Sequence, residues 1–201
     1  MIDGYEYDIF LSFPRAGGAF DWVRNHFHPV LLETLTDALG QPPRIFLYTE
    51  QENGLAWTAN IVRSLQRSRY LVAVWGPTYF RSAWCLAEWE SIRRREQLLG
   101  MRTVDDPRGL IYPIIYVDGA NLPEEALTIY SNSTANLSDW AVPMPQFKDT
   151  PGFVLFYVAM RGVANELRDL LPQAPPWQKD WPVVTPDENG SRKPPSVKPR
   201  M

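Results

Sequence analysis

A tryptophan and a glutamate four residues apart, Trp84 and Glu88, are the side chains best suited to chemistry in this sequence. Residues with this spacing lie on one face of a helix, so a large aromatic ring and a carboxylate would stand side by side. Such a pair offers a flat apolar wall beside a negative charge, where a ligand can sit. The plainer interpretation is a core tryptophan flanked by a solvated glutamate, and the spacing alone leaves both open.

The elements around this pair predict where it lies. An apolar run from Tyr70 to Trp75 is typical of a strand buried on both faces, and Gly76-Pro77 ends it. Ser82 can cap the following helix, which Gly100 ends. Four residues of this helix share the face expected to pack on the core: Cys85, Leu86, Trp89 and Ile92. The aromatic–carboxylate pair falls on a neighbouring face, at the border of the core.

Composition and charge narrow the classes of function. The chain has 201 residues, of which 45% are hydrophobic and 21% charged, as in ordinary globular domains. A net charge of −3 gives no general attraction to nucleic acid or to an anionic membrane, so we expect neither as a partner. With Cys85 as the single cysteine and His26 and His28 as the only histidines, we expect no disulfide and no metal site. No run reaches membrane-spanning length and the first residues do not resemble a signal peptide, so a cytoplasmic location is expected.

Strand-like and helical segments alternate along the rest of the chain. Further strands are expected at Tyr7–Phe13, Arg44–Thr49, Gly109–Val117 and, as a short final strand, Leu137–Trp140. Helices are expected at Phe20–Leu39, Trp57–Arg67 and Phe153–Leu171. Pro29 should kink or divide the first of these helices, and Pro113 should weaken the sheet beyond its strand.

The end of the chain has a different composition. From residue 172 on, eight of the nineteen prolines fall within thirty residues, mixed with charged residues and serine. We therefore predict one domain over residues 1–171 and a proline-rich, partly disordered tail over residues 172–201. Trp177 or Trp181 would dock the first part of this tail.

This alternation predicts an α/β fold with a parallel sheet and helices on both faces, because right-handed crossovers join the strands. In flavodoxin-like sheets with strand order 2-1-3-4-5, ligands bind beyond the carboxyl ends of strands 1 and 3, where the winding reverses. Those ends are Ser12-Phe13-Pro14-Arg15 and Trp75-Gly76-Pro77 in this chain. The helix with Trp84 and Glu88 leaves from the second of them, so topology and side-chain chemistry indicate the same crevice.

Three stretches resemble the sequence boxes of the Toll/interleukin-1 receptor (TIR) domain: YDIFLSF, RIFLYTEQENGLAW and SRYLVAVWGPTYFRSAWCLAEWESI. They occur in the expected order, and the resemblance covers about residues 5–171. The bacterial and plant members that the chain resembles hydrolyse or cyclise NAD, and their catalytic glutamate stands four residues after a tryptophan. The resemblance therefore implies that Glu88 is catalytic, that Trp84 binds substrate, and that NAD is a substrate while no cofactor is needed.

The resemblance also implies roles for two loops and for partners. The loop after the first strand would border the nucleotide through three residues: Phe13, Pro14 and Arg15. The segment Glu50–Trp57 matches the so-called BB loop, which in the family contacts the next protomer, here through Gly54, Leu55 and Trp57. Other TIR protomers are then partners in a homo-oligomer or filament, and a role in bacterial immune or anti-phage signalling is implied.

The chemistry fits a sparse site. Ordinary glycoside hydrolysis uses two carboxylates, one of them an acid for a poor leaving group. Nicotinamide departs neutral from a pyridinium cation, so one carboxylate suffices, and Glu88 would stabilise the positive charge that develops on the ribose. Many members have an aspartate at the end of the second strand, where this chain has Tyr48-Thr49, so the ribose must be held differently. We expect an open crevice without a lid, which a neighbouring protomer would cover.

Two other functions stay open. A non-catalytic TIR scaffold would only assemble with other TIR domains, and it would not need the Trp84–Glu88 pair. A nucleoside deoxyribosyltransferase-like enzyme would need a carboxylate arrangement that this sequence lacks. For an NAD-cleaving enzyme, linear and cyclic ADP-ribose are both possible products.

Overall fold

A central parallel sheet organises the computed structural model, which describes residues 4–15, 17–48, 55–103, 108–117, 126 and 135–186. The strands are β1 (Tyr7–Ser12), β2 (Ile45–Phe46), β3 (Ser68–Trp75), β4 (Ile111–Ile115) and β5 (Ala135–Asn136). Neighbouring strands pair in parallel in the order β2-β1-β3-β4-β5. The predicted α/β fold of the flavodoxin-like type is confirmed.

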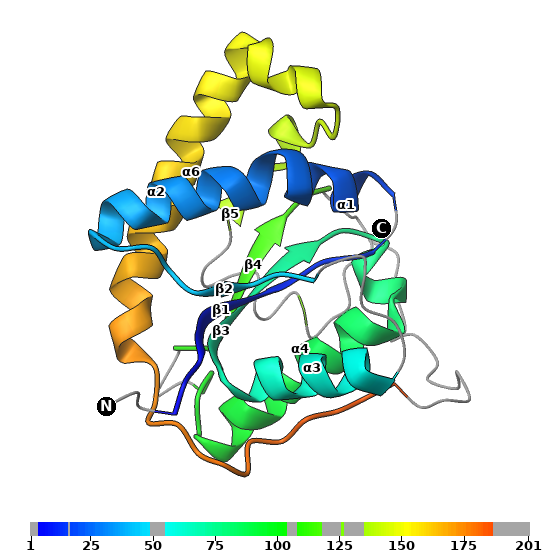
Figure 1. Cartoon of the computed structure of the whole chain (residues 1–201), viewed down its shortest axis with the longest axis vertical. Helices are drawn as coiled ribbons and strands as arrows, with labels where there is room; N and C mark the ends of the chain where they lie inside the picture. Colours follow the sequence, from blue (N-terminus) through cyan, green and yellow to red (C-terminus); the bar gives the residue numbers. More distant parts are fainter. Residues whose placement is uncertain are drawn as a thin grey trace.

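Helices cover both faces of this sheet (Figure 1). On one face, α1 (Gly18–Trp22), the π-helical segment η1 (Val23–Phe27) and α2 (His28–Leu39) form one rod that packs against α6 (Pro151–Leu170). On the other face lie α3 (Leu55–Gln66) and α4 (Ala83–Leu98). Between these layers, every residue from Tyr70 to Trp75 of β3 is at most 2% exposed, as expected for a strand buried on both faces.

Local signals explain how two of these helices begin and end. The hydroxyl of Ser82 accepts the amide hydrogen of Cys85 at 3.3 Å and begins α4, and Gly100 follows its end with a φ of 65°. Pro29 stands in the first turn of α2, directly after the wide turn of η1. The missing amide hydrogen of proline thus falls where the hydrogen-bond pattern already changes, so the rod is not divided there.

The last strand differs from the prediction. β5 is Ala135–Asn136. The predicted strand Leu137–Trp140 is wrong, because Ser138–Trp140 form the 3-10 helix η3 and Leu137 connects this helix to β5. The carbonyl of Trp140 accepts a hydrogen bond from the indole of Trp22 at 2.8 Å. This contact with the helical rod favours a turn at Trp140 over continued strand pairing.

Part of the proline-rich end packs on the domain. Residues 174–186, here called the strap, run along the outer side of α3 and α4 (Figure 1). Trp181 is 2% exposed, and its ring centre lies 4.9 Å from the guanidinium of Arg95 on α4. The amide of Val184 donates to the hydroxyl of Ser91 at 2.7 Å. The boundary at residue 171 stays a prediction, and residues 187–201 lie outside the described part of the chain.

Candidate functional site

The carboxyl ends of β1 and β3 lie side by side at the reversal point of the sheet. Ser12, the last residue of β1, is in register with Ala73 of β3. Beyond β3 the chain passes through the short 3-10 helix η2 (Tyr79–Arg81) and enters α4. These connections bring three polar side chains, from β1, η2 and α4, to one point.

Glu88 is held at this point by a hydroxyl group. Its Oε2 atom accepts a hydrogen bond of 2.6 Å from the Oγ of Ser12. The hydroxyl of Tyr79 lies 2.9 Å from the same Oγ. Ser12 and Tyr79 are fully buried, and Glu88 is 1% exposed. Its second oxygen, Oε1, is also buried and has no hydrogen-bond partner among the described residues.

This burial corrects the expectation that Glu88 borders the core and faces an open crevice. Glu88 stands three residues after Cys85 and four before Ile92, and both of these are core residues. The side of α4 that packs on the sheet therefore includes Glu88. The carboxyl group is tolerated there because Ser12 supplies a hydrogen bond inside the protein.

The buried surroundings change the acidity of Glu88. Burial raises its pKa to about 8, while the hydrogen bond from Ser12 and the positive charge of Arg15 act in the opposite direction. Near neutral pH the carboxyl group of the free chain is therefore mostly protonated. Burial also raises the pKa of the neighbouring Cys85 to about 12, so this thiol is a poor nucleophile.

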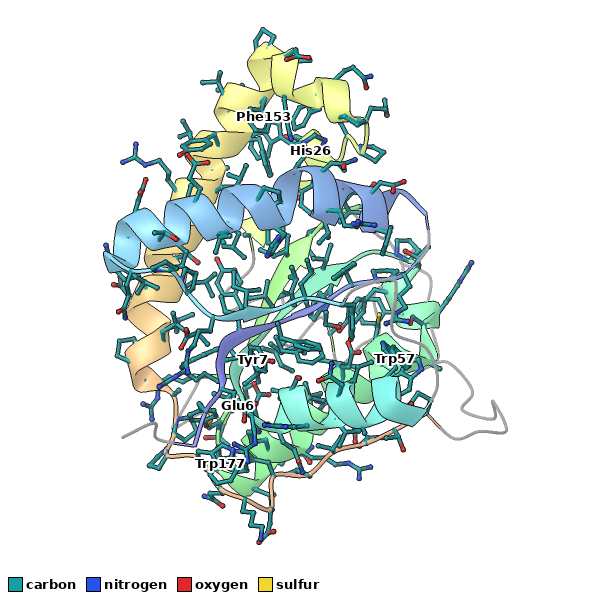
Figure 2. The ribbon with its side chains drawn as sticks, viewed as in Figure 1. Glu6, Tyr7, His26, Trp57, Phe153 and Trp177 are labelled. Carbon is teal, nitrogen blue, oxygen red and sulfur yellow. The ribbon has the colours of Figure 1, made fainter. Side chains whose placement is uncertain are left out.

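An aromatic cluster, defined as Tyr48, Trp57 and Trp84, stands beside Glu88 and holds Arg15. The guanidinium carbon of Arg15 lies 3.9 Å from the ring centre of Trp57 and 4.8 Å from that of Tyr48. The Trp57 and Trp84 rings meet edge to face with their centres 4.7 Å apart. Trp57 lies near the N-terminal end of α3, close to the start of α4 (Figure 2). The cluster therefore links α3, α4 and the loop after β1.

A hollow of about 250 Å³ opens next to the aromatic cluster, between the edge strand β2 and α3. It is lined by Tyr7, Ile45, Phe46, Leu47, Tyr48, Trp57 and Asn60. Tyr48 and Trp57 are thus shared between this hollow and the Arg15 contacts. Glu88 and Trp84 do not line the hollow.

The remaining candidates from the sequence take different positions. Phe13 and Pro14 are buried, and the ring of Phe13 packs against Tyr48, so both support the site from the core side. Gly54 lies outside the described residues. Leu55 is the first residue of α3, and its side chain is not among those described. Of the predicted assembly residues, Trp57 is the one whose contacts can be compared with the site.

Sequence reasoning missed the partners of Glu88. Ser12 ends the buried stretch Ile9–Ser12 of β1, in which it is the one polar residue, and a buried hydroxyl needs a hydrogen-bond partner, so the sequence did carry a signal for this contact. Tyr79 follows Gly76-Pro77 without any pattern that predicts its role. Tyr48 was noted only as a departure from the family, although it is one of two rings that contact Arg15.

Two findings concern the described part of the chain as a whole. Within it, no group of three or more His, Cys, Asp or Glu side chains is arranged so that it could hold a metal ion. None of its helices combines the length and the apolar character needed to cross a membrane.

Comparisons with known proteins indicate what the chain is similar to. The family model described as "TIR domain" matches residues 9–129, a range that contains Ser12, Arg15, Trp84 and Glu88. Among solved structures, one match is to the TIR domains of the activated Roq1 resistosome that directly recognizes the pathogen effector XopQ. It has 19% sequence identity and a TM-score of 0.41, and it covers 82% of this chain and 85% of that chain. A comparison with curated proteins finds no significant match.

Proposed function

The chain belongs to the TIR domain family, and we propose that it cleaves the bond between nicotinamide and ribose in NAD, as an NAD glycohydrolase or ADP-ribosyl cyclase. The observation that carries this proposal is a single buried carboxyl group at the reversal point of the sheet. Glu88 has Trp84 one helical turn before it and the positive charge of Arg15 nearby. These are the residue types that a cationic nicotinamide, a ribose and a diphosphate require.

The reaction needs one ionised carboxylate. When the bond from nicotinamide to the anomeric carbon breaks, its electron pair neutralises the pyridinium ring, so no acid is required. The positive charge then lies on the ribose, and Glu88 stabilises it through Oε1, the oxygen that has no hydrogen-bond partner within the described chain. Water bonds to the anomeric carbon and loses a proton to give ADP-ribose. Attack by a nitrogen of the adenine ring gives the cyclic product.

Trp84 and Arg15 hold the rest of the substrate in this proposal. The ring of Trp84 is half-buried and offers an apolar wall to the ribose or nicotinamide. The guanidinium of Arg15 lies over the ring of Trp57, and Arg15 is exposed, so its N–H donors are available to a phosphate. The loss of Arg15 would therefore weaken binding more than the chemical step.

Access to Glu88 requires the side chains around it to move, because Oε1 is buried. This links catalysis to assembly. Trp57 belongs to the segment Glu50–Trp57, which we propose contacts the next protomer, and it also touches Arg15 and Trp84. When the loop of a neighbouring TIR protomer packs against this site and displaces Trp57, it would loosen the aromatic cluster and complete the site of the protomer that it contacts. Assembly then activates the enzyme in the cytoplasm, in bacterial immune or anti-phage signalling.

The second candidate is a non-catalytic TIR scaffold. The burial of Glu88 and its raised pKa favour this reading, since a permanently protonated carboxyl group would only fill the core. In that case the same loop would mediate assembly without any chemistry.

One incubation distinguishes the two functions. Concentrated protein is mixed with NAD, and nicotinamide, ADP-ribose and cyclic ADP-ribose are separated by chromatography. Nicotinamide release with one ADP-ribose product is the expected result, and the ratio of products identifies hydrolase or cyclase. NAD that stays intact at concentrations where the protein has assembled would support the scaffold.

A further inference from the structure

We propose that Tyr79 and Ser12 are positioning residues for Glu88: two hydroxyl groups in series fix Oε2 and leave Oε1 as the oxygen that meets the substrate. The inference rests on the proposed function for its use in catalysis, but the hydrogen-bond chain itself does not depend on NAD.

The direction of this chain follows from the number of protons available. In the ionised form of Glu88, which the reaction needs and which predominates above about pH 8, the carboxylate only accepts hydrogen bonds, so the single proton of the Ser12 hydroxyl is donated to Oε2 over 2.6 Å. Ser12 then has no proton left for Tyr79, and the 2.9 Å contact between them must be a donation from the phenol. The short first bond has the length of a charge-assisted bond between a hydroxyl and a carboxylate.

The chain works only while Tyr79 keeps its proton, and its burial ensures this. Burial raises the pKa of Tyr79 well above that of an exposed tyrosine. Of the other titratable groups nearby, Arg15 is positive and acts on Glu88, and Cys85, which interacts with Ser12 and Tyr79, stays neutral because burial raises its pKa. Ser12 and Tyr79 are therefore the neutral groups that favour the ionised form of Glu88, in addition to the charge of Arg15.

The three members of the chain come from rigid and separate elements. Ser12 ends β1, Tyr79 begins η2 and Glu88 lies in the second turn of α4. A carboxyl group on a flexible side chain would otherwise be free to rotate about its last bond. Tethering one oxygen to the end of the sheet fixes the direction of the other, which is what stabilisation of a developing charge requires.

The test measures the pKa of Glu88 directly by carboxyl carbon NMR in the unliganded protein. Tyr79→Phe removes one hydroxyl and keeps the ring, and Ser12→Ala removes the direct donor. The control is Tyr112→Phe, which deletes another largely buried phenol, whose hydroxyl donates to Glu166 at 2.6 Å away from the site. We expect the pKa of Glu88 to rise by about one unit in Ser12→Ala, by less in Tyr79→Phe and not at all in the control. An unchanged pKa in both site variants would overturn the inference.

Kinetics separate the inference from the proposed function. If NAD is cleaved, both site variants should lower kcat with little change in KM, and the acidic limb of their pH–rate profiles should move to higher pH. If the NMR shift occurs and no NAD is cleaved by any form of the protein, the hydrogen-bond chain stands and the proposed function fails. Normal kcat values with unchanged pH profiles in both variants would contradict the positioning role.

Discussion

The side chains of Ser12 and Glu88 are joined by a hydrogen bond of 2.6 Å, although the two residues stand 76 positions apart. The bond forms because β1 and β3 are neighbours and α4 packs its Cys85–Ile92 side onto the sheet. A carboxyl group that was expected at the rim thus lies inside the protein. Its position affects the pH dependence of stability, the pH dependence of catalysis and the access of substrate.

Stability should fall as pH rises through the pKa of Glu88. The folded-state pKa of about 8 lies above the ordinary value of 4.5, so the folded chain binds this proton more tightly than the unfolded chain. Between these values the folded state carries more protons, and the free energy of unfolding decreases with pH. Glu88→Gln keeps the shape without the charge. At about pH 9 the variant should be more stable than the original protein, by on the order of a few kcal/mol.

Thermal unfolding at several pH values checks this prediction. The advantage of Glu88→Gln should shrink as pH falls and disappear only well below the unfolded-state pKa of 4.5, at about pH 3, where Glu88 is protonated in both states. Glu90→Gln, on the same helix and paired with Arg94 at 2.9 Å, is the matched control and should show no such trend. A stability difference between Glu88→Gln and the original protein that does not change with pH would contradict the buried position of this carboxyl group.

Catalysis should show the opposite pH trend, because the reaction needs the ionised form of Glu88. We expect kcat/KM for NAD to rise with pH and to level off above about 8, the pKa of the free protein. The limb in kcat should lie lower, since a cationic nicotinamide beside the carboxylate lowers its pKa. Initial rates over a range of pH test both statements. A kcat/KM limb near 4.5 would mean that the reacting carboxyl group is exposed.

Much of the fold could be predicted from the sequence because its strands are short apolar runs with turn residues at their ends. The run Tyr70–Trp75 and the break at Gly76-Pro77 fixed the central strand, and the alternation with helices predicted the sheet order. The last strand was placed wrongly, at Leu137–Trp140, where the structure has a 3-10 helix whose Trp140 carbonyl accepts a hydrogen bond from the distant Trp22, a contact that the sequence does not reveal.

The candidate site was predicted less completely. Its place at the reversal point followed from topology, and Trp84 and Glu88 followed from helical spacing. The burial of Glu88 did not follow, because glutamate is a poor candidate for a core position unless a partner is known. That partner, Ser12, is distant in the sequence, and so is Trp57, whose contact with Trp84 couples the predicted assembly loop to the site.

The strap should contribute to stability through one tryptophan. Trp181→Ala removes a buried ring that covers the guanidinium of Arg95, and the loss should be about 3 kcal/mol or more in the free energy of unfolding. Trp177→Ala, at a half-buried ring near the end of α3 (Figure 2), should cost less. Chemical denaturation measures both. Equal losses in the two tryptophan variants would contradict the role given to Trp181.

The last twelve residues should not matter for the domain. We expect deletion of residues 190–201 to change neither stability nor activity.

Activity should depend on assembly. The rate per molecule is expected to rise with protein concentration, because in the proposed mechanism a neighbouring protomer opens and completes the site. A substitution of Trp57 would not affect assembly alone, because Trp57 also contacts Arg15 and Trp84 in the site. Leu55→Asp is used instead, and it should abolish activity while the pKa of Glu88 stays unchanged.

A mixing experiment tests whether sites are shared between protomers. Leu55→Asp protein retains Glu88, and Glu88→Gln protein retains the assembly loop, so the mixture should recover part of the lost NAD cleavage. A mixture as inactive as its components would contradict a shared site. A rate strictly proportional to protein concentration at every level would contradict activation by assembly.

The most direct test of the central claim is nicotinamide release from NAD by three proteins at the same high concentration: the original chain, Glu88→Gln and Glu90→Gln. Circular dichroism first establishes that all three are folded. We predict that the original chain and Glu90→Gln release nicotinamide at similar rates, while Glu88→Gln releases none above the rate of NAD alone. Equal release by Glu88→Gln, or no release by the assembled original chain, would contradict the assignment of Glu88 as the catalytic residue of an NAD-cleaving enzyme.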